Sequence, residues 1–456
     1  MNSGRAAVAV PRSVPVRARA GAVADLLPER WSLAYVAFLA YTFGMVTGRL
    51  PIGTPAAVLA VVLLALEGRR PAVPPWFRWM IGMLLWGAVG LVTTRYPAQV
   101  QLGLIEFLKL VVVVGLGINI IRTRRQAAFF LVFALGVYLL YPVRGTFVRY
   151  FVHHDTAFGR AIGVGIYENS NDLAALTLLQ LSVALALYMD PRRGWTRQVA
   201  LGIAAVLALV IVLTQSRGVY LGTAFFGALL IRSQRHKLRI MLALTVASVV
   251  ILVTAPEGTF DRFSRLTSLF GGGEIAELDA EGSAEGRAEI YRLAVRISLD
   301  HPVTGVGLDA YPLAHRDYAM RSGQMTTATS GALDTHSTYL NALAETGVPG
   351  LIMYLAMLGT ALRSTVRIRR RLRPYRPDLH AELGVLLAGF YGFMLAAVVG
   401  TYTSLALPYV HLCAIWLLAR TGEREAAALA SGRALGPAEE AGGQPRGRRA
   451  LRGPRR

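Results

Sequence analysis

Long uninterrupted runs of apolar residues constrain this chain more than any other feature. A helical run of about 20 apolar residues matches the thickness of the hydrocarbon core of a bilayer. We count about twelve, near residues 31–48, 52–67, 76–94, 102–121, 126–142, 171–189, 198–214, 217–232, 238–254, 347–365, 381–400 and 403–420. Because a helix satisfies its own backbone hydrogen bonds, each run predicts a spanning helix. The sequence therefore predicts an all-α polytopic membrane protein with about 12 transmembrane helices.

The low content and the distribution of charged residues support a membrane protein and argue against a nucleic-acid-binding protein. Only 16% of the 456 residues are charged, whereas soluble proteins carry about 25%. The net charge of +21 could indicate nucleic-acid binding, but that needs basic residues gathered on one folded soluble face. Here most of the 48 Lys and Arg residues fall in alternate short connections and in the two terminal segments. By the positive-inside rule, this distribution predicts a multi-pass protein with both termini in the cytoplasm.

The spacing of the runs predicts five regions. Residues 1–30 form an Arg-rich cytoplasmic tail, 31–254 hold transmembrane helices 1–9, 255–346 form a large extracytoplasmic loop, 347–420 hold helices 10–12, and 421–456 form a disordered basic cytoplasmic tail. The first segment lacks the short apolar core and cleavage site of a secretory signal. The single cysteine, Cys413, excludes an intrachain disulfide and a thiol metal cluster.

The large loop contains an amphipathic helix. In "RAEIYRLAVRISLDHP" (287–302), apolar residues recur at 290, 294, 297 and 299, and Pro302 ends the pattern. "GVG" at 305–307 then predicts a tight turn. The large extracytoplasmic loop is therefore expected to carry short amphipathic helices.

One stretch at the end of this loop carries a candidate base. In "DTHSTYLNALAETGVPGLIMYL" (334–355), Asp334 or Thr335 can cap a short helix, and the Gly-Val-Pro-Gly sequence at 347–350 interrupts it before the next span. The positive end of a helix disfavours an imidazolium, so His336 is expected to be neutral and able to accept a proton from a hydroxyl. The alternative is a histidine that only forms hydrogen bonds at the membrane interface.

Arg217 lies in "TQSRGVYLG" (214–222), where two spans are joined by almost no loop. An arginine at the bilayer centre costs about 3 kcal/mol on insertion scales, and on the outward side it has no use in setting topology. An anionic ligand explains it better. The alternative is an arginine that extends to the lipid headgroups.

Further arginines lie on the amphipathic helix of the large loop. Arg287 begins this helix, and Arg292 and Arg296 are four residues apart on one face. Arginine forks bind phosphate groups well. A solvated face paired with Glu285 and Glu289 is the alternative.

Two other polar groups have weaker functional interpretations. "HHD" at 153–155 could bind a metal ion, but three adjacent residues converge poorly on one ion. Glu106 and Lys109, three residues apart in a predicted span, are expected to form an internal ion pair.

Four segments together resemble the family of O-antigen ligases and Wzy-type O-antigen polymerases. "YENSNDLAALTLLQL" (167–181) is similar to the family's "NPN-x-LA" motif, with Ser170 at the proline position. "TQSRG" (214–218) resembles its "T-x-SRG" corner. "RAEIYRLAVRISLDHPVTGVGLDAY" (287–311) resembles its "R-x-x-x-W … HP-x-x-GVG" segment, with Tyr291 at the tryptophan position. "THSTYLNALAETGVPGLIMYL" (335–355) resembles its "HN-x-YL-x-x-LAE-x-G-x-x-G" signature, with Ser337 at the asparagine position.

The resemblance implies a metal-independent, inverting glycosyltransferase of GT-C-like architecture in the bacterial inner membrane, without a cofactor. Such enzymes move a glycan from a polyprenyl-pyrophosphate donor to an acceptor hydroxyl on the outer side of that membrane. Carried over, Arg217 and Arg287 would bind the donor pyrophosphate, with Arg292 as a further candidate. His336 would activate or orient the acceptor hydroxyl, and no metal ligand is expected. The acceptor would be lipid A–core, a growing glycan or a protein.

Several functions remain open at this stage. The first is a ligase that moves a finished glycan, the second a polymerase that joins repeat units, and the third a protein O-oligosaccharyltransferase. A twelve-span transporter is an alternative of another class. Transporters often contain two related halves with sites near the midplane of the bilayer. This chain shows no such halves, and its polar residues are concentrated in one outer loop.

Overall fold

A computed structural model describes residues 27–48, 52–190, 194–233, 283–321 and 333–430. The ninth predicted span, 238–254, lies outside the described residues. So do most of the predicted N-terminal tail and residues 431–456.

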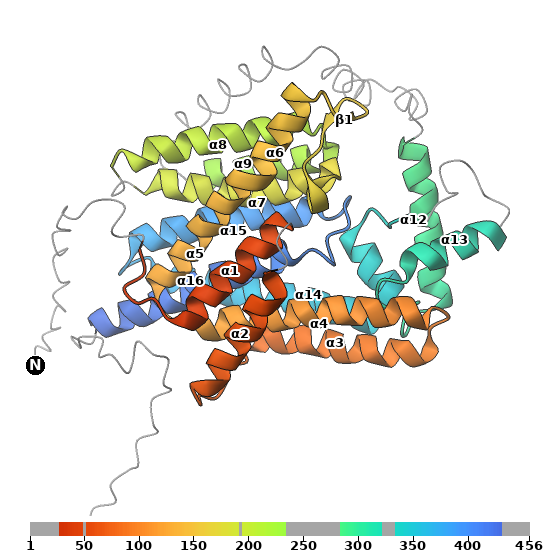
Figure 1. Ribbon diagram of the computed structural model, residues 1–456, viewed down its shortest axis with the longest axis horizontal. Helices are drawn as coiled ribbons and strands as arrows, with labels where there is room; N and C mark the ends of the chain where they lie inside the picture. Colours follow the sequence, from red (N-terminus) through yellow and green to blue (C-terminus); the bar gives the residue numbers. More distant parts are fainter. Residues whose placement is uncertain (1–26, 49–51, 191–193, 234–282, 322–332, 431–456) are drawn as a thin grey trace, which may run out of the picture.

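Apolar helices that run side by side form the body of the molecule (Figure 1). They are α1 (Leu33–Thr47), α2 (Gly53–Leu66), α3 (Pro75–Thr93), α4 (Pro97–Ile120), α5 (Arg124–Tyr138), α7 (Ser170–Met189), α8 (Thr196–Leu213), α9 (Arg217–Ser233), α14 (Thr338–Leu372), α15 (Pro377–Ala396) and α16 (Ala406–Ala430). Within the described residues, 7 helices are long and apolar enough to cross a membrane, and α1 and α2 are shorter apolar helices. The predicted polytopic membrane protein is confirmed, and every predicted span but the ninth coincides with one of these helices.

Helix α7 occupies the centre of the bundle. It packs against α8 on one side and α15 on another, and α15 in turn packs against α9. A helix surrounded by protein needs no polar face. Accordingly, its residues Leu173, Leu176 and Leu179 are all fully buried.

The helix that begins with α5 is longer than the sequence predicted. Its predicted span ends at 142, but α5 continues through Leu139–Val143, α6 (Arg144–Phe147) and Val148–Val152 as one helix. Pro142 lacks the N–H that an α-helical turn requires, and a wide, π-helical turn at 139–143 accommodates it. The chain then forms a hairpin of β1 (Thr156–Ala157) and β2 (Arg160–Ala161).

Helix α14 is interrupted at Gly347, as the sequence predicted. Gly347 has φ 68° and ψ −173°, a conformation that residues other than glycine rarely adopt. A Cβ atom at this position would lie 2.1 Å from the carbonyl oxygen of Val303. The first three turns of α14 therefore form a separate short helix at the end of the bundle.

The turn at 302–307 packs against this interruption. The Val306 and Gly307 N–H groups donate to the carbonyl oxygens of Ala344 and Glu345, each at 2.9 Å, and the Val348 N–H donates to the Pro302 oxygen at 2.8 Å. An interrupted helix leaves carbonyl groups without intrahelical partners. The predicted Gly-Val-Gly turn supplies the missing donors and thereby fixes the short helix to the loop.

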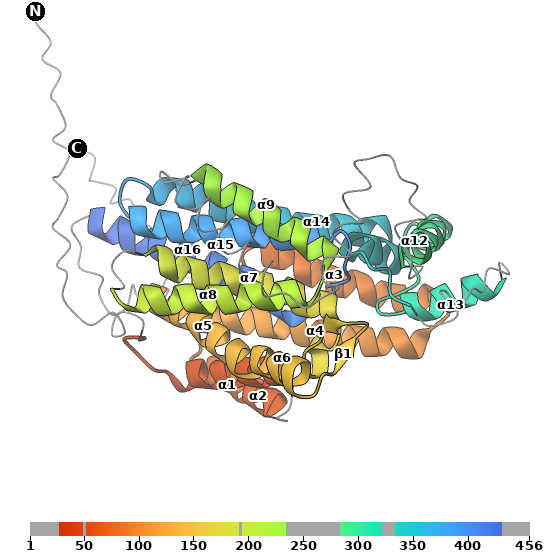
Figure 2. The same cartoon turned by 90° about the horizontal axis from the view of Figure 1, so that it is seen from above.

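Helices α12 (Ser283–Asp300) and α13 (Tyr311–Arg321) lie beyond the ends of α3 and α4 (Figures 1 and 2). A small hydrophobic core of their own joins them to the bundle through Val100 of α4 and Ala344 of α14. The predicted amphipathic helix is confirmed, and Ile290, Ala294 and Ile297 are buried as expected. The prediction for Leu299 is wrong, because its side chain is 73% exposed on the outer face.

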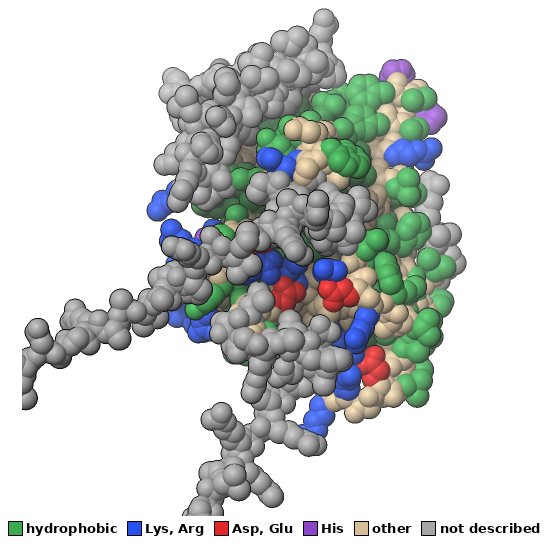
Figure 3. Space-filling model, turned by 90° about the vertical axis from the view of Figure 1, so that its left-hand side faces the viewer, with side chains coloured by type: hydrophobic (Ala, Val, Ile, Leu, Met, Phe, Trp, Pro, Cys, Tyr) green, Lys and Arg blue, Asp and Glu red, His purple; other side chains and the backbone are tan. Residues whose placement is uncertain are grey.

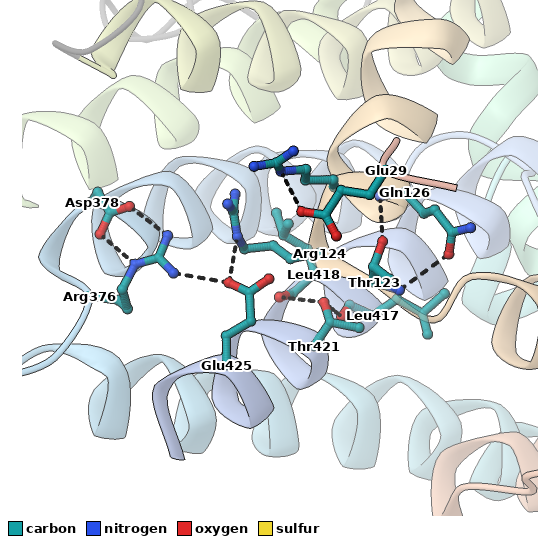
Figure 4. Close-up of polar contacts among 11 residues, drawn as sticks. Glu29, Thr123, Arg124, Gln126, Arg376, Asp378, Leu417, Leu418, Thr421 and Glu425 are labelled. Carbon is teal, nitrogen blue, oxygen red and sulfur yellow. Dashed lines mark hydrogen bonds and ion pairs between the residues drawn. The ribbon is translucent and has the colours of Figure 1, made fainter. Parts of the chain in front are cut away.

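The opposite end of the bundle is basic, and Figure 3 shows Lys and Arg side chains spread over it. There, Arg376 binds both Asp378 and Glu425, and Glu425 also binds Arg124 of α5 (Figure 4). Glu425 belongs to α16, which continues to Ala430. The prediction of a disordered tail from residue 421 onward is therefore wrong for 421–430, because these ion pairs hold α16 against its neighbours.

Candidate functional site

A cavity of about 440 Å³ lies at the end of the bundle that carries the β-hairpin and α12. Segments far apart in the sequence meet around it: the hairpin, the starts of α7, α9 and α12, and the turn that follows α15. Its lining residues are Phe158, Arg160, Asn171, Gln215, Ser216, Arg217, Gly218, Val219, Arg287, Ala396, Val399 and Tyr402.

The first turn of α9 forms one wall of this cavity. Only residues 214–216 connect α8 to α9, and Gln215 makes the reversal with φ 50°. Arg217, Gly218 and Val219 all line the cavity. The N–H groups of a first turn have no intrahelical acceptor and carry a partial positive charge, so a helix start of this kind favours an anion.

Two of the three predicted arginines meet in this cavity. Arg217 from α9 and Arg287 from α12 both line it, although 70 positions separate them in the sequence. Among the described residues, no carboxylate forms an ion pair with either of them. Two cations beside a helix start make the cavity suitable for a ligand that carries more than one negative charge.

Arg292, the third predicted arginine, is exposed on α12 and is not a lining residue of the cavity. Five residues separate it from Arg287, which is about one and a half helical turns. The two side chains therefore leave α12 on different faces. The structure does not bring Arg292 together with Arg217 and Arg287.

A third arginine in the cavity, Arg160, was not anticipated from the sequence. Its Nε donates to the Thr214 carbonyl oxygen at 2.9 Å, and its Nη2 donates to Asn171 Oδ1 at 2.8 Å. Asn171 Oδ1 also accepts a hydrogen bond from the Ser216 hydroxyl at 2.8 Å. These bonds join the β-hairpin to the starts of α7 and α9. Arg160 lies in no motif, so only the fold reveals its position.

His336 lies directly before the short helix of α14, in an unusual backbone conformation. Ser337 caps the helix by accepting a hydrogen bond from the Leu340 N–H at 3.5 Å, so the predicted caps Asp334 and Thr335 are wrong. His336 itself has φ 50°, which is uncommon for a residue other than glycine. Backbone strain of this kind is frequent at functional sites.

Hydrogen bonds on both sides fix the position of His336. The Tyr291 hydroxyl of α12 donates to its carbonyl oxygen at 3.1 Å. The Thr338 hydroxyl donates to the Gly400 carbonyl at 2.7 Å and accepts from the Tyr402 N–H at 2.9 Å. His336 is therefore held between α12 and the turn after α15, although it is not itself a lining residue of the cavity.

The surroundings of His336 keep its ring neutral. Burial lowers the pKa of His336, and the Arg287 guanidinium and the His315 ring lower it further. A pKa below the usual 6.5 leaves the imidazole uncharged at pH 7 and able to accept a proton. Tyr291, which donates to the His336 carbonyl, follows Arg287 by four residues, or about one turn of α12.

Asp334 lies two residues before His336. The surrounding protein raises the pKa of the Asp334 carboxyl to about 6, against a hydrogen bond from the Thr335 N–H that lowers it. The Asp309 carboxylate raises it further. Burial likewise raises the pKa of Asp309. These carboxyls belong to a second, acidic cavity next to the first.

The structure tests the two weaker hypotheses from the sequence, a metal site at 153–155 and an internal ion pair of Glu106 with Lys109. In the described part of the chain, no three His, Cys, Asp or Glu side chains gather as a metal site would require. Asp155 of "HHD" binds Arg149 instead, at 2.7 Å. Glu106 and Lys109 do pair, at 2.6 Å, but their side chains are 67% and 55% exposed. The ion pair is confirmed, whereas its internal position is wrong.

These features define a class: a polytopic membrane protein with an arginine-lined cavity and a neutral histidine at one end of its bundle. Residues 201–355 match the family model described as O-antigen ligase (Wzy_C). This match includes Arg217, Arg287 and His336. The family comprises enzymes that act on lipid-linked glycans.

Two curated relatives extend the comparison. The chain is 26% identical over 199 residues to an O-antigen polymerase of Salmonella muenchen, an alignment that covers 44% of this chain and 47% of the relative. It is 24% identical over 290 residues to the exopolysaccharide production protein ExoQ of Rhizobium meliloti (strain 1021), covering 62% and 64%. The chain thus spans about half to two thirds of these relatives and is related to proteins of polysaccharide assembly.

Proposed function

We propose that this protein is a glycosyltransferase that moves a glycan from a polyprenyl-pyrophosphate donor to an acceptor hydroxyl. The observation that carries the proposal is the cavity in which Arg217 and Arg287 meet the start of α9, while the Arg287 guanidinium also lowers the pKa of His336. A pyrophosphate carries several negative charges close together, which suits two guanidinium groups and a helix N-terminus. Arg160 is a third candidate for the same anion.

The proposed reaction is a direct displacement. The acceptor oxygen attacks the anomeric carbon of the donor and forms the new glycosidic bond. The bond between that carbon and the pyrophosphate oxygen breaks, and its electron pair leaves with the polyprenyl pyrophosphate. His336 accepts the proton of the acceptor hydroxyl. The arginines stabilise the negative charge that grows on the leaving group. Attack opposite the leaving group gives inversion, and no step requires a metal ion.

We also propose that the site faces the outer side of a bacterial inner membrane, within a GT-C-like architecture. The basic ends of α14 to α16 and of α5 lie at the other end of the bundle, where the positive-inside rule expects the cytoplasm. A donor anchored by its lipid would place its reactive bond at the membrane surface beside His336. Both termini would then be cytoplasmic.

The names of the two relatives bear on the choice of acceptor. One is a polymerase and the other an exopolysaccharide production protein. These names favour the joining of repeat units, in which the acceptor is the end of another glycan. Ligation to lipid A–core and transfer to a protein hydroxyl are the alternatives.

Product analysis of purified protein in lipid tests the proposal. The protein is given a polyprenyl-pyrophosphate glycan with and without lipid A–core, and products are identified by mass spectrometry. A ladder of glycan lengths from donor alone supports polymerisation, and one transfer that requires lipid A–core supports ligation. If no product depends on His336, the proposed transfer is wrong, and solute flux would be measured next.

A further inference from the structure

A second cavity, of about 160 Å³, lies on the other side of the turn that follows α15. In this turn, Tyr402 lines the first cavity, whereas its neighbours Thr401 and Thr403 line the second. The start of α14 borders the second cavity through Asp334 and Asn341. The segment that holds His336 thus borders the second cavity, and its Thr338 accepts a hydrogen bond from the N–H of Tyr402, which lines the first.

The charge of the second cavity is opposite to that of the first. Four carboxyl groups line it, from Glu106, Asp309, Asp334 and Glu345. Glu106 is paired with Lys109, and none of the described lining residues of the cavity is Lys or Arg. The two cavities therefore attract different chemical groups. A pyrophosphate suits the first, and phosphate or carboxylate groups are repelled from the second.

Uncharged polar side chains form a further part of the lining, and apolar side chains such as Met83, Phe107 and Leu308 complete it. Asn341, Thr401, Thr403, Ser404 and Tyr409 supply amide and hydroxyl groups. Carboxylates accept hydrogen bonds from neighbouring hydroxyls, while amides and hydroxyls both donate and accept them. Such a mixture suits a ligand that carries many hydroxyl groups and no charge.

The second cavity reaches the side of the bundle along α4. Glu106 lies nine residues after Pro97, the first residue of α4, which corresponds to about 13 Å along the helix axis. Glu106 lines the cavity and is nevertheless largely exposed. The cavity is therefore open at the bundle surface, where a glycan attached to a membrane lipid can approach.

From these observations we infer that the second cavity binds the acceptor, and that the acceptor end bound there is an uncharged saccharide. The inference rests on the proposed function, because it assigns the second substrate to the same reaction centre. The cationic cavity binds the donor through its pyrophosphate. The acidic cavity accepts the neutral end of another glycan and disfavours a phosphorylated one. The charges of the two cavities thereby keep each substrate in its own place.

The experiment compares two acceptors that differ only in charge. The first is the oligosaccharide repeat released from the cell's own polysaccharide, and the second is the same repeat with one phosphate ester on its terminal sugar. Transfer is measured at fixed donor concentration, and donor binding is measured separately with labelled polyprenyl pyrophosphate. We expect the wild-type enzyme to prefer the uncharged acceptor by about tenfold or more in kcat/KM, because the phosphate meets carboxylates.

The variant is the double substitution Asp309→Asn, Asp334→Asn. Both changes keep the shape of the side chain, and asparagine tolerates the φ of 61° at position 309. We expect the KM for the uncharged acceptor to rise about tenfold and the preference over the phosphorylated acceptor to shrink. Donor binding stays unchanged. Glu423→Gln, a carboxylate at the opposite end of the bundle, is the matched control.

Three outcomes separate this inference from the proposed function. If the wild-type enzyme uses both acceptors equally, or if the double variant keeps the wild-type preference, the acceptor assignment is wrong while the transfer reaction stands. A native repeat whose acceptor end is itself anionic also overturns the assignment. If labelled polyprenyl pyrophosphate does not bind the wild-type protein, the proposed function itself fails.

Discussion

His336 combines two properties that are rarely found together. Its backbone is held in a left-handed conformation by buried neighbours, and its ring is kept neutral by burial and by Arg287. A general base must be uncharged and precisely placed relative to the hydroxyl that it activates. The fixed backbone supplies the placement, and the surroundings supply the protonation state.

The replacement His336→Ala tests this role. If His336 is the general base, transfer falls by about 10²- to 10⁴-fold, because the acceptor hydroxyl loses its proton acceptor. Binding of labelled polyprenyl pyrophosphate is retained, since the arginines are untouched. The control is His153→Ala, which removes an exposed histidine of the hairpin region. Equal losses in both variants would contradict the role of His336.

The pH dependence of transfer provides a second test at this scale. Because its pKa is lowered, His336 is protonated and inactive only below pH 6.5, so the acidic limb of kcat/KM lies below that value. Arg287→Gln removes one cause of the lowering and should move this limb to higher pH. Asp334, with a pKa of about 6, titrates in the same range. The profile of Asp334→Asn separates the two groups, and a limb unmoved by Arg287→Gln would refute the coupling.

Arginine geometry is tested by Arg217→Lys. An ammonium group keeps the charge but cannot make the two parallel hydrogen bonds of a guanidinium, so donor affinity should fall about tenfold. Arg292→Lys is the matched control, because Arg292 is exposed and outside the cavity. An equal loss of donor affinity in the control would mean that Arg292 also binds the pyrophosphate, as the sequence suggested.

At the scale of elements, the interruption of α14 positions the site. The short helix after His336 is held by the turn at 302–307 and by the turn after α15. Its direction is set at Gly347, where α14 changes course toward the bundle. The sequence predicted this break because glycine and proline disfavour a continuous helix. It could not predict which segments pack against the break, since those contacts join residues about 40 positions or more apart.

The replacement Gly347→Ala is expected to damage this arrangement. An alanine at φ 68° is strained by about 1–3 kcal/mol, and its Cβ would also clash with Val303. The thermal unfolding midpoint in detergent should fall, and transfer with it. Gly359→Ala in the same helix is the control, because nothing lies within 4 Å of its added Cβ. Alanine is the better helix former there and should leave the midpoint equal or higher.

The sequence predicted the helices better than the site. Apolar runs identify spans because the bilayer imposes length and composition on each of them separately. The assembly of the site depends instead on distant contacts, which explains why Arg160 was missed and why Arg292 was included. Arg160 reaches the cavity only through the β-hairpin, and Arg292 leaves α12 on a face that its sequence position alone does not determine. Local motifs pointed to Arg217, Arg287 and His336 because each lies at a helix start or turn, and their roles stay predictions.

For the molecule as a whole, the two ends of the bundle differ in their charged groups and cavities. One end carries both cavities, and the other carries the ion pairs of Glu425 with Arg124 and Arg376. The proposed reaction requires the first end to face outward, where a flipped lipid-linked glycan is presented. Under the positive-inside rule, the distribution of basic residues favours the cytoplasm for the second end. The proposed reaction and the charge distribution thus predict the same orientation.

Labelling of single cysteines tests this orientation directly. Cys413 is buried and is first replaced by alanine. Val152→Cys, at the end of the long helix beside the hairpin, and Tyr375→Cys, between α14 and α15, then place one exposed thiol at each end. A membrane-impermeant maleimide added to spheroplasts should label position 152 and reach position 375 only after the membrane is opened. The reverse pattern would place His336 and both cavities on the cytoplasmic side, and the proposed outward-facing transfer would have to be abandoned.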